Sequence, residues 1–472
     1  MEDENIAQAI PNAEASEWMS RNIPLFDCPQ QNFEEMFYYR WWTLRKHIKH
    51  TPVGYGMTEF LVNRSYSDKY NLIACAVGHH VYESRWLHDG RYVDQIVRTW
   101  LRGNDGGPME KLHKFSSWIP DAVWNRYLVT ADRDDLADLY DDLKTDYAWW
   151  EQTHRLPSGL YWQGDVQDGM EESISGGRRK EYARPTINSY MYGNARALAA
   201  TARLLGLGGD AEMFDAKAEE IKSLIEKYLW NEEHGFFETL RGDETSAVRE
   251  AIGYIPWYFG MPETGGKYDS AWLQIVDEKG FAAPYGLTTA ERRHPEFRTH
   301  GVGQCEWDGA IWPFATSQTL TALANYLNAS DSPVVGREAY FDQMNRYVES
   351  QHHRGRPYIG EYLDEVTGYW LKGDQERSRY YNHSTFNDMI ITGLAGLRPR
   401  GDNTLEVNPL LPEGRWEWFC LDNVPYHGHM VTILWDEKGD RYNHGRGLHI
   451  LVDGREVGSA PTLTRVVCED VL

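Results

Sequence analysis

The sequence predicts a mainly α fold, a toroid of helical hairpins followed by a small antiparallel β domain. From about Phe33 to Leu397 apolar residues recur at helical spacing, whereas after residue 400 they alternate with polar residues at strand spacing. Long loops rich in Gly and aromatic residues separate the helical stretches. Helical hairpins arranged in a ring, with functional loops gathered at one end, account for these features.

Three segments follow in chain order. Residues 1–32 are polar and punctuated by Pro11, Pro24 and Pro29, which predicts an arm laid over the helical domain. Residues 33–400 form the helical domain, and residues 401–472 the β domain. About twelve helices are expected, centred near residues 40, 78, 96, 124, 144, 196, 219, 255, 272, 318, 342 and 390.

Composition restricts the class of ligand. The net charge is −23, from 48 basic and 71 acidic residues, and such a field repels nucleic acid and anionic membrane surfaces. The 19 Trp and 29 Tyr residues combine apolar faces with polar edges. Aromatic excess together with acidic excess therefore favours a carbohydrate substrate.

No other feature indicates a cofactor, a metal or a partner chain. The five cysteines are dispersed, which predicts neither a disulfide framework nor a zinc site. No apolar run is long enough to span a membrane, and residues 1–14 do not resemble a signal peptide. We expect a cytoplasmic protein, or a periplasmic or secreted one if an export signal was removed; the oligomeric state stays open.

Three long loops, 155–185, 277–308 and 352–383, combine carboxylates with aromatic residues. Loops of this length are uncommon in a compact domain unless they are functional. In the first, "QDGMEESISG" carries Asp168, Glu171 and Glu172 shortly after Trp162. A solvated acidic turn and one half of an acid/base pair both fit this pattern.

The later loops show the same combination. Glu361 lies in "RPYIGEYLDEVTGYW" beside Tyr358 and Tyr362, and a solvated turn is again the alternative. In "GQCEWDGAIWPF", Asp308 is suited either to capping the helix that follows or to binding sugar hydroxyls with Glu306.

Taken together, the three loops favour glycoside hydrolysis. This reaction needs one protonated and one ionised carboxyl group in different environments. The sequence has no phosphate-binding loop, no Gly-x-Ser-x-Gly nucleophile elbow and no His-Glu-x-x-His motif. The adjacent pairs His79-His80 and His352-His353 are more typical of structural histidines than of metal ligands.

On these motifs the chain resembles the six-hairpin (α/α)6-barrel glycosidases related to trehalase, processing α-glucosidase and mannosylglycerate hydrolase. "DGMEESISG" is similar to the loop that carries their general acid and implies that role for Glu171. "GEYLDEVTG" is similar to the context of their late Glu and implies that Glu361 is the general base. "EWDGAIWPF" resembles the stretch that opens a barrel helix and contacts substrate, with Asp308 and Trp312.

The resemblance has one departure, because those relatives carry Asp where this chain has Glu171. Asp168, three residues upstream, therefore stays open as the general acid. The resemblance implies an inverting mechanism. A pocket closed by the long loops predicts an exo-acting hydrolase that releases a terminal sugar, and a pentose is among the possible sugars. The predicted substrate contacts are Tyr66, Asp68, Trp162, Gln163, Arg184, Asn188, Glu306, Trp307, Asp308 and Trp312.

Two other functions fit the same features. A sugar epimerase, isomerase or lyase could use a helical toroid, with His383 as the acid/base group in place of Glu361. A non-catalytic carbohydrate-binding protein would bind sugar without releasing reducing ends.

Overall fold

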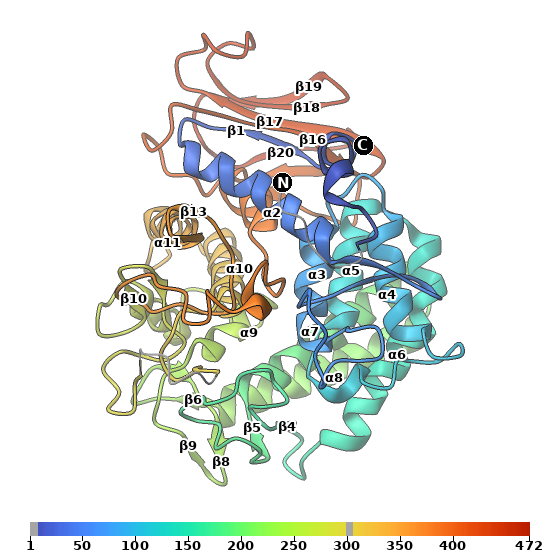
Figure 1. Cartoon of the computed structure of the whole chain (residues 1–472), viewed down its shortest axis with the longest axis vertical. Coiled ribbons are helices and arrows are strands. Elements are labelled where there is room, and N and C mark those ends of the chain that lie inside the picture. Colours follow the sequence, from blue (N-terminus) through green and yellow to red (C-terminus); the bar gives the residue numbers. More distant parts are fainter. Residues whose placement is uncertain (1–7, 299–304) are drawn as a thin grey trace.

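The computed structural model describes residues 8–298 and 305–472 (Figure 1). Residues 1–7 of the expected arm and 299–304 of the expected loop 277–308 lie outside the described residues. The α-helices are α1 (Ala15–Asn22), α2 (Gln31–His47), α3 (Val77–Ser84), α4 (Arg91–Arg102), α5 (Ile119–Thr130), α6 (Arg133–His154), α7 (Pro185–Leu205), α8 (Gly208–Tyr228), α9 (Ile255–Tyr258), α10 (Pro313–Ala329), α11 (Arg337–Ser350) and α12 (Asn387–Met389).

The helices lie where the apolar periodicity predicts them, with three differences. Lys267–Ile275 is a 3₁₀ helix, and α12 continues as a π-helix over Ile390–Leu394. Helix α1 lies within the expected polar arm; it buries only Ala15 and Trp18, so its apolar stripe is too sparse to be read from sequence.

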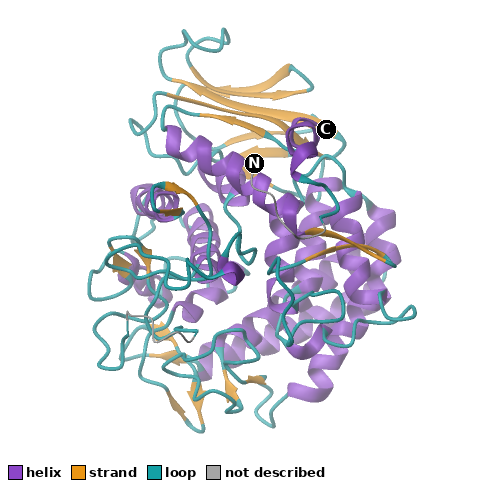
Figure 2. Cartoon of the chain, in the orientation of Figure 1, coloured by secondary structure: helices purple, strands orange, loops and turns teal. Residues whose placement is uncertain are grey.

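Successive hairpin helices pack against one another. Helix α3 contacts α5, α5 contacts α7, α7 contacts α9, α9 contacts α10, and α12 contacts both α10 and α3. Helices α4, α6, α8 and α11 pack on α3, α5, α7 and α10, respectively. The helices thus surround a common centre; the largest sheet lies at one end, and shorter strands lie at the opposite end and beside the helices (Figure 2).

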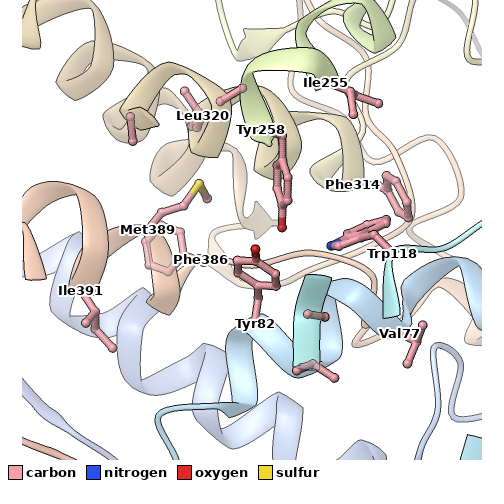
Figure 3. Packing of buried hydrophobic residues seen from close by; sticks show 14 of the residues in the cluster. Val77, Tyr82, Trp118, Ile255, Tyr258, Phe314, Leu320, Phe386, Met389 and Ile391 are labelled. Atoms are coloured by element: carbon pink, nitrogen blue, oxygen red, sulfur yellow. The ribbon is translucent and has the colours of Figure 1, made fainter. Parts of the chain in front are cut away.

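The contacting helices share one hydrophobic core. Tyr82 of α3 and Tyr258 of α9 point toward one another across it, with ring centroids 5.6 Å apart (Figure 3). Trp118, next to the first residue of α5, packs edge-on against Phe314 of α10, and both are buried. Large aromatic side chains therefore fill the centre at the level of these helices.

A five-stranded antiparallel sheet forms the C-terminal domain. Its order is β1 (Leu25–Asp27), β16 (Trp418–Tyr426), β17 (His429–Asp436), β18 (Gly447–Val452) and β19 (Arg455–Ala460). A second sheet joins β14 (Leu397–Arg398), β15 (Leu405–Val407) and β20 (Val466–Cys468). Because β1 comes from the N-terminal segment and pairs with β16, that segment is part of the sheet and not only an arm over the helices.

Short strands lie in the connections between the helices. These are β2 (Ile48–Thr51), β3 (Gly54–Met57), β4 (Trp162–Gln163), β5 (Tyr182–Ala183), β6 (Trp230–Asn231), β7 (Phe236–Phe237), β8 (Leu240–Arg241), β9 (Glu244–Thr245), β10 (Ala282–Ala283), β11 (Gly286–Leu287), β12 (His352–His353) and β13 (Arg356–Pro357). Within the described ranges, no helix has the length and apolar character needed to cross a membrane.

Candidate active site

A cavity of about 340 Å³ lies where the three acid-and-aromatic loops meet. The first loop contributes Glu171, the second Cys305 and Trp312, and the third Glu361. Further lining residues include Glu59, Tyr66, Lys114, Arg179, Arg377, Tyr381 and His383. Two carboxyl groups from distant parts of the chain, Glu171 and Glu361, therefore face one enclosed space.

Backbone hydrogen bonds join the loops. The amide of Trp307 donates to the carbonyl oxygen of Glu171 at 3.3 Å. Ile311 and Leu363 exchange two backbone hydrogen bonds of 3.0 Å. These bonds fix the second loop between the other two.

An aromatic stack also crosses the junction of the second and third loops. Trp312 stacks on Trp307 and on Tyr362, with both centroid distances 4.6 Å. Trp312 lines the cavity, and its two neighbours hold the ring in place. The residue after it, Pro313, begins α10, which suits the first position of a helix.

The three acids of "QDGMEESISG" have three different environments. Asp168 is fully buried; Arg184 Nε donates to it at 2.6 Å, and the hydroxyls of Ser116 and Thr186 donate as well. Glu172 pairs with Arg178 on the other side of the loop. Asp168 and Glu172 are thus held by cations, and neither lines the cavity.

Glu171 lies between them and faces the cavity. Burial raises the pKa of Glu171 to about 7, and the negative charge of Glu361 contributes to the increase. No ion pair to its carboxyl group is found among the described residues. A carboxyl group of this kind holds a proton near neutral pH, as a general acid must.

Glu361 has the opposite environment. Arg377 donates to both of its oxygens at 2.8 Å, and Lys372 Nζ lies 3.1 Å from Oε2. The thiol of Cys305 is 3.7 Å from Oε1. Two cations therefore contact the carboxyl group of Glu361, whereas none contacts that of Glu171 among the described residues.

Gly360 makes this position of Glu361 possible. A Cβ atom at residue 360 would lie 2.7 Å from the Trp370 ring and 2.8 Å from the Tyr358 ring. Only glycine lets the backbone pass between these two rings, which lie in a small hydrophobic cluster under the loop.

Of the predicted substrate contacts, Tyr66 and Trp312 line the cavity, and the others support the loops. Arg184 holds Asp168, and Asn188 binds both backbone polar groups of Tyr161 at 2.8 Å. Asp308 pairs with Arg298, and neither it nor any other side chain caps α10. The remaining five residues, Asp68, Trp162, Gln163, Glu306 and Trp307, do not line the cavity either.

Sequence reasoning missed three side chains of the site. Glu59, which directly follows the short β2–β3 hairpin and Thr58, lines the cavity, and burial raises its pKa to about 8. Arg377 and Lys372 contact Glu361 from the part of the third loop that follows it. Glu59 lies outside the three long loops, so the pattern that indicated the other acids does not include it.

His383, the alternative acid/base group, also lines the cavity. Burial lowers the pKa of His383 to about 3, and its Nδ1 lies 3.5 Å from Glu59 Oε1. The imidazole is therefore neutral at physiological pH. Among the described residues, no group of three or more His, Cys, Asp or Glu side chains is placed to hold a metal ion.

Residues 69–384 match the model of the mannosylglycerate hydrolase MGH1-like glycoside hydrolase domain. The chain belongs to this glycoside hydrolase family. Glu171, Glu361 and Arg377 lie within the matched residues, whereas Glu59 and Tyr66 precede them. The match confirms the expected class of enzyme and the resemblance to mannosylglycerate hydrolase.

Residues 397–458 match a second model, the C-terminal domain of glycosyl hydrolase family 65. They include most of the C-terminal sheet. A β domain that accompanies glycoside hydrolases therefore follows the helical one.

Solved structures show similar folds. A chain named "Sialidase" is 70% identical with a TM-score of 0.99; the match covers all of this chain and 44% of that one. The GH63 mannosylglycerate hydrolase of Thermus thermophilus in complex with glucose is 15% identical, with a TM-score of 0.56, over 75% of this chain and 98% of that one. A GH78 rhamnosidase of Bacillus sp. GL1 is 14% identical, with a TM-score of 0.61; the match covers 88% of this chain and 40% of that one.

Proposed function

We propose that the protein is an exo-acting, inverting glycoside hydrolase with Glu171 as the general acid and Glu361 as the general base. Glu171 donates its proton to the glycosidic oxygen as the bond to the sugar breaks. Glu361 accepts a proton from a water molecule that attacks the anomeric carbon from the opposite face. One proton leaves Glu171 and one reaches Glu361, so the pair exchanges its protonation states during the reaction.

One observation carries this proposal: two carboxyl groups in one cavity have opposite electrostatic environments. The pKa of Glu171 is raised to about 7 by burial, whereas Glu361 contacts two cations. Two carboxyl groups in such different surroundings suit the separate acid and base roles of a glycoside hydrolase. Asp168 is a positioning residue in this account. Its carboxylate lies behind the cavity wall, where it pairs with Arg184 and accepts hydrogen bonds from two hydroxyl groups.

The size of the site supports exo action. A cavity of about 340 Å³ is at the small end of ligand sites, which span about 300–1,000 Å³. One sugar residue fits such a volume, while a continuous chain passing through would need an open cleft.

We infer that the ring of helix contacts is the six-hairpin (α/α)6 toroid of this enzyme class, in a domain spanning residues 33–400. The packing order that returns from α12 to α3 supports it. The loops with Glu171, Glu361 and Trp312 then lie at one mouth of the toroid, and residues 401–472 with β1 form the accessory β domain.

The relatives' names suggest which sugars to test first. Mannosylglycerate, rhamnosides and sialosides are named in them. More than half of the "Sialidase" chain lies outside the match, so its name does not assign sialoside cleavage to this part. Pentosides belong in the same panel, because the resemblance includes enzymes that act on arabinose-type sugars.

A panel of nitrophenyl glycosides and natural disaccharides tests the proposal. We expect release of a free sugar from at least one substrate, and a loss of at least about 10³-fold in kcat for Glu361→Gln. Glu376→Gln, an exposed acid of the same loop, is the matched control and should retain activity. Bound sugar without hydrolysis of any substrate would favour a binding protein, and a loss below about tenfold would remove Glu361 from the pair.

A further inference from the structure

A second cavity, of about 330 Å³, lies further along the helices that carry the catalytic one. On α10, Phe314 lines the catalytic cavity, whereas Thr321 and Asn325 line the second. At 1.5 Å per residue, these two positions lie roughly 10 and 16 Å further along the helix axis. In the segment that forms α12, His383 lines the first cavity and Asp388 the second. The two cavities therefore occupy different levels of one ring of helices.

Packed aromatic side chains lie between the two cavities. Phe314, at the catalytic cavity, packs edge-on against Trp118, and Trp118 packs edge-on against Tyr258 at 5.7 Å (Figure 3). Tyr258 and its neighbour Tyr82 line the second cavity. Within the described ranges, no residue lines both cavities. The second cavity is thus a space distinct from the active site.

Charged side chains line the second cavity, and they are Arg85, Arg196, Arg398, Asp121 and Asp388. Two of these charges cancel, because Arg85 and Asp388 pair at 2.8 Å with side chains that are 3% and 2% exposed. Asp121 is buried and accepts a hydrogen bond of 2.8 Å from the Tyr82 hydroxyl. Burial raises the pKa of Asp121 to about 7, so this carboxyl group is only partly ionised near neutral pH.

Arg196 and Arg398 supply the remaining charges. Arg398 of β14 is half-buried and donates to the amide oxygen of Asn325 at 3.1 Å. Glu406, its partner on β15, pairs with two other arginines instead. Across residues 8–298 and 305–472, neither Arg196 nor Arg398 forms an ion pair. Two guanidinium groups therefore stand against one partly ionised carboxyl group in the lining of this cavity.

Burial makes an unpaired arginine costly. It lowers the pKa of Arg398 from its ordinary value, since the charged form loses water without gaining a carboxylate. Groups of this kind are normally paired inside proteins. An anion bound in the cavity would supply the counter-charge that the chain itself does not give to Arg398.

The backbone beside the cavity gives an independent indication. Helix α12 continues as a π-helix over Ile390–Leu394, and Thr392 of that turn lines the cavity. Such π-helical turns are rare and occur frequently at functional sites. An unusual turn and an excess of positive charge thus meet at one cavity.

We propose that this second cavity binds a small anionic ligand, about the size of one sugar residue, through a phosphate or carboxylate group that pairs with Arg398 and Arg196. Charge-assisted hydrogen bonds from two guanidinium groups suit either oxyanion. The volume is at the small end of ligand sites, which span about 300–1,000 Å³, and limits the ligand to that size. The site lies outside the catalytic cavity, so its occupant is not the substrate.

Calorimetric titration at low ionic strength with glucose 6-phosphate, glucuronate and glucose tests the proposal. We expect at least one of the two anions to bind at least about tenfold more tightly than glucose, because only the anions can pair with the arginines. Tighter binding of the first identifies a phosphate as the preferred group, and tighter binding of the second a carboxylate. Equal affinity for all three, or no binding of either anion, would overturn the proposal.

Two variants locate the bound anion. Arg398→Met keeps an apolar stem and should weaken binding at least about tenfold, and Arg196→Glu, which reverses an exposed charge, should do the same. Arg179→Met is the matched control, because Arg179 is an exposed cation that lines the catalytic cavity, and it should change affinity less than twofold.

Unchanged affinity in either variant of the second cavity would overturn the proposal, and a loss confined to Arg179→Met would place the anion in the catalytic cavity instead. Should Arg398→Met fail to fold, Arg196→Glu decides alone, because Arg196 is exposed. The titration needs no turnover, so its outcome is independent of the assignment of Glu171 and Glu361.

Discussion

Arg377 donates to both carboxylate oxygens of Glu361 at 2.8 Å. This two-point contact does more than supply charge, because it also fixes the orientation of the carboxylate plane toward the cavity. Lys372, at 3.1 Å, supplies the second cation. The position of the Glu361 carboxylate therefore depends on residues that follow it within its own loop.

Replacing Arg377 tests that dependence. We expect Arg377→Met to lower kcat at least about tenfold, since the general base loses its orientation and one neighbouring cation. Arg377 makes both bonds with one nitrogen, Nη2; Arg377→Lys keeps a charge on a more flexible side chain, and should recover only part of the rate. Steady-state kinetics of the three proteins on one substrate measure this. Full activity in Arg377→Met would show that the contact plays no part in turnover.

The pKa of Glu171 predicts the alkaline limb of the rate profile. A general acid must be protonated, so kcat/KM should fall as pH rises through about 7. Glu171→Gln should abolish that limb and should lower kcat/KM at least about 10²-fold on substrates with a sugar leaving group. It should stay within about tenfold of wild type on a dinitrophenyl glycoside, whose leaving group needs no proton. Glu172→Gln, its neighbour, is the control and should keep the limb.

Asp168 has a structural role that stability measurements can detect. Both members of the Asp168–Arg184 pair are 0% exposed, so removing one charge leaves the other buried and uncompensated. We expect Asp168→Asn to lower the free energy of unfolding by about 3–5 kcal/mol in urea titrations. Asp215→Asn, in an exposed pair with Arg203, should cost less than about 1 kcal/mol. An Asp168→Asn protein of unchanged stability with no activity would make Asp168 the reacting acid.

Glu59 makes the stability of the folded protein depend on pH. Its pKa is about 8 in the folded protein against an ordinary value of 4.5, so the folded state holds the proton more strongly than the unfolded state. Its contribution to stability is complete below about pH 4.5 and is lost as pH rises through about 8. The free energy of unfolding of Glu59→Gln should not show this decline with rising pH.

Unfolding of wild type and Glu59→Gln at about pH 5, 7 and 9 measures the difference. The variant should gain stability relative to wild type as pH rises. A constant difference across the three pH values would mean that Glu59 is ionised throughout.

Much of the site could be predicted because its residues cluster in sequence. Acids beside aromatic residues and glycines indicated the three loops, and the structure brings these loops together through Trp307, Ile311 and Leu363. The helix positions followed from apolar periodicity, since that pattern reflects burial on one face.

The distinct environments of neighbouring acids could not be predicted. Whether Asp168 or Glu171 pairs with Arg184 depends on how the loop folds back on the start of α7. The two acids are only three residues apart, and the sequence between them does not determine that conformation. Asp308 suited a helix cap, yet in the structure it pairs with Arg298. Glu59 joins the site only through the tertiary fold, where its backbone carbonyl accepts from the amide of Asn382 at 3.0 Å.

The anomeric configuration of the first product tests the central claim most directly. Proton NMR during hydrolysis, before the free sugar equilibrates between its anomers, shows which anomer is released. With Glu171 as acid and Glu361 as base for water, the product should have the configuration opposite to that of the substrate. Release of the same configuration would mean that a carboxylate attacks the sugar as a nucleophile, and would contradict the assignment of Glu361.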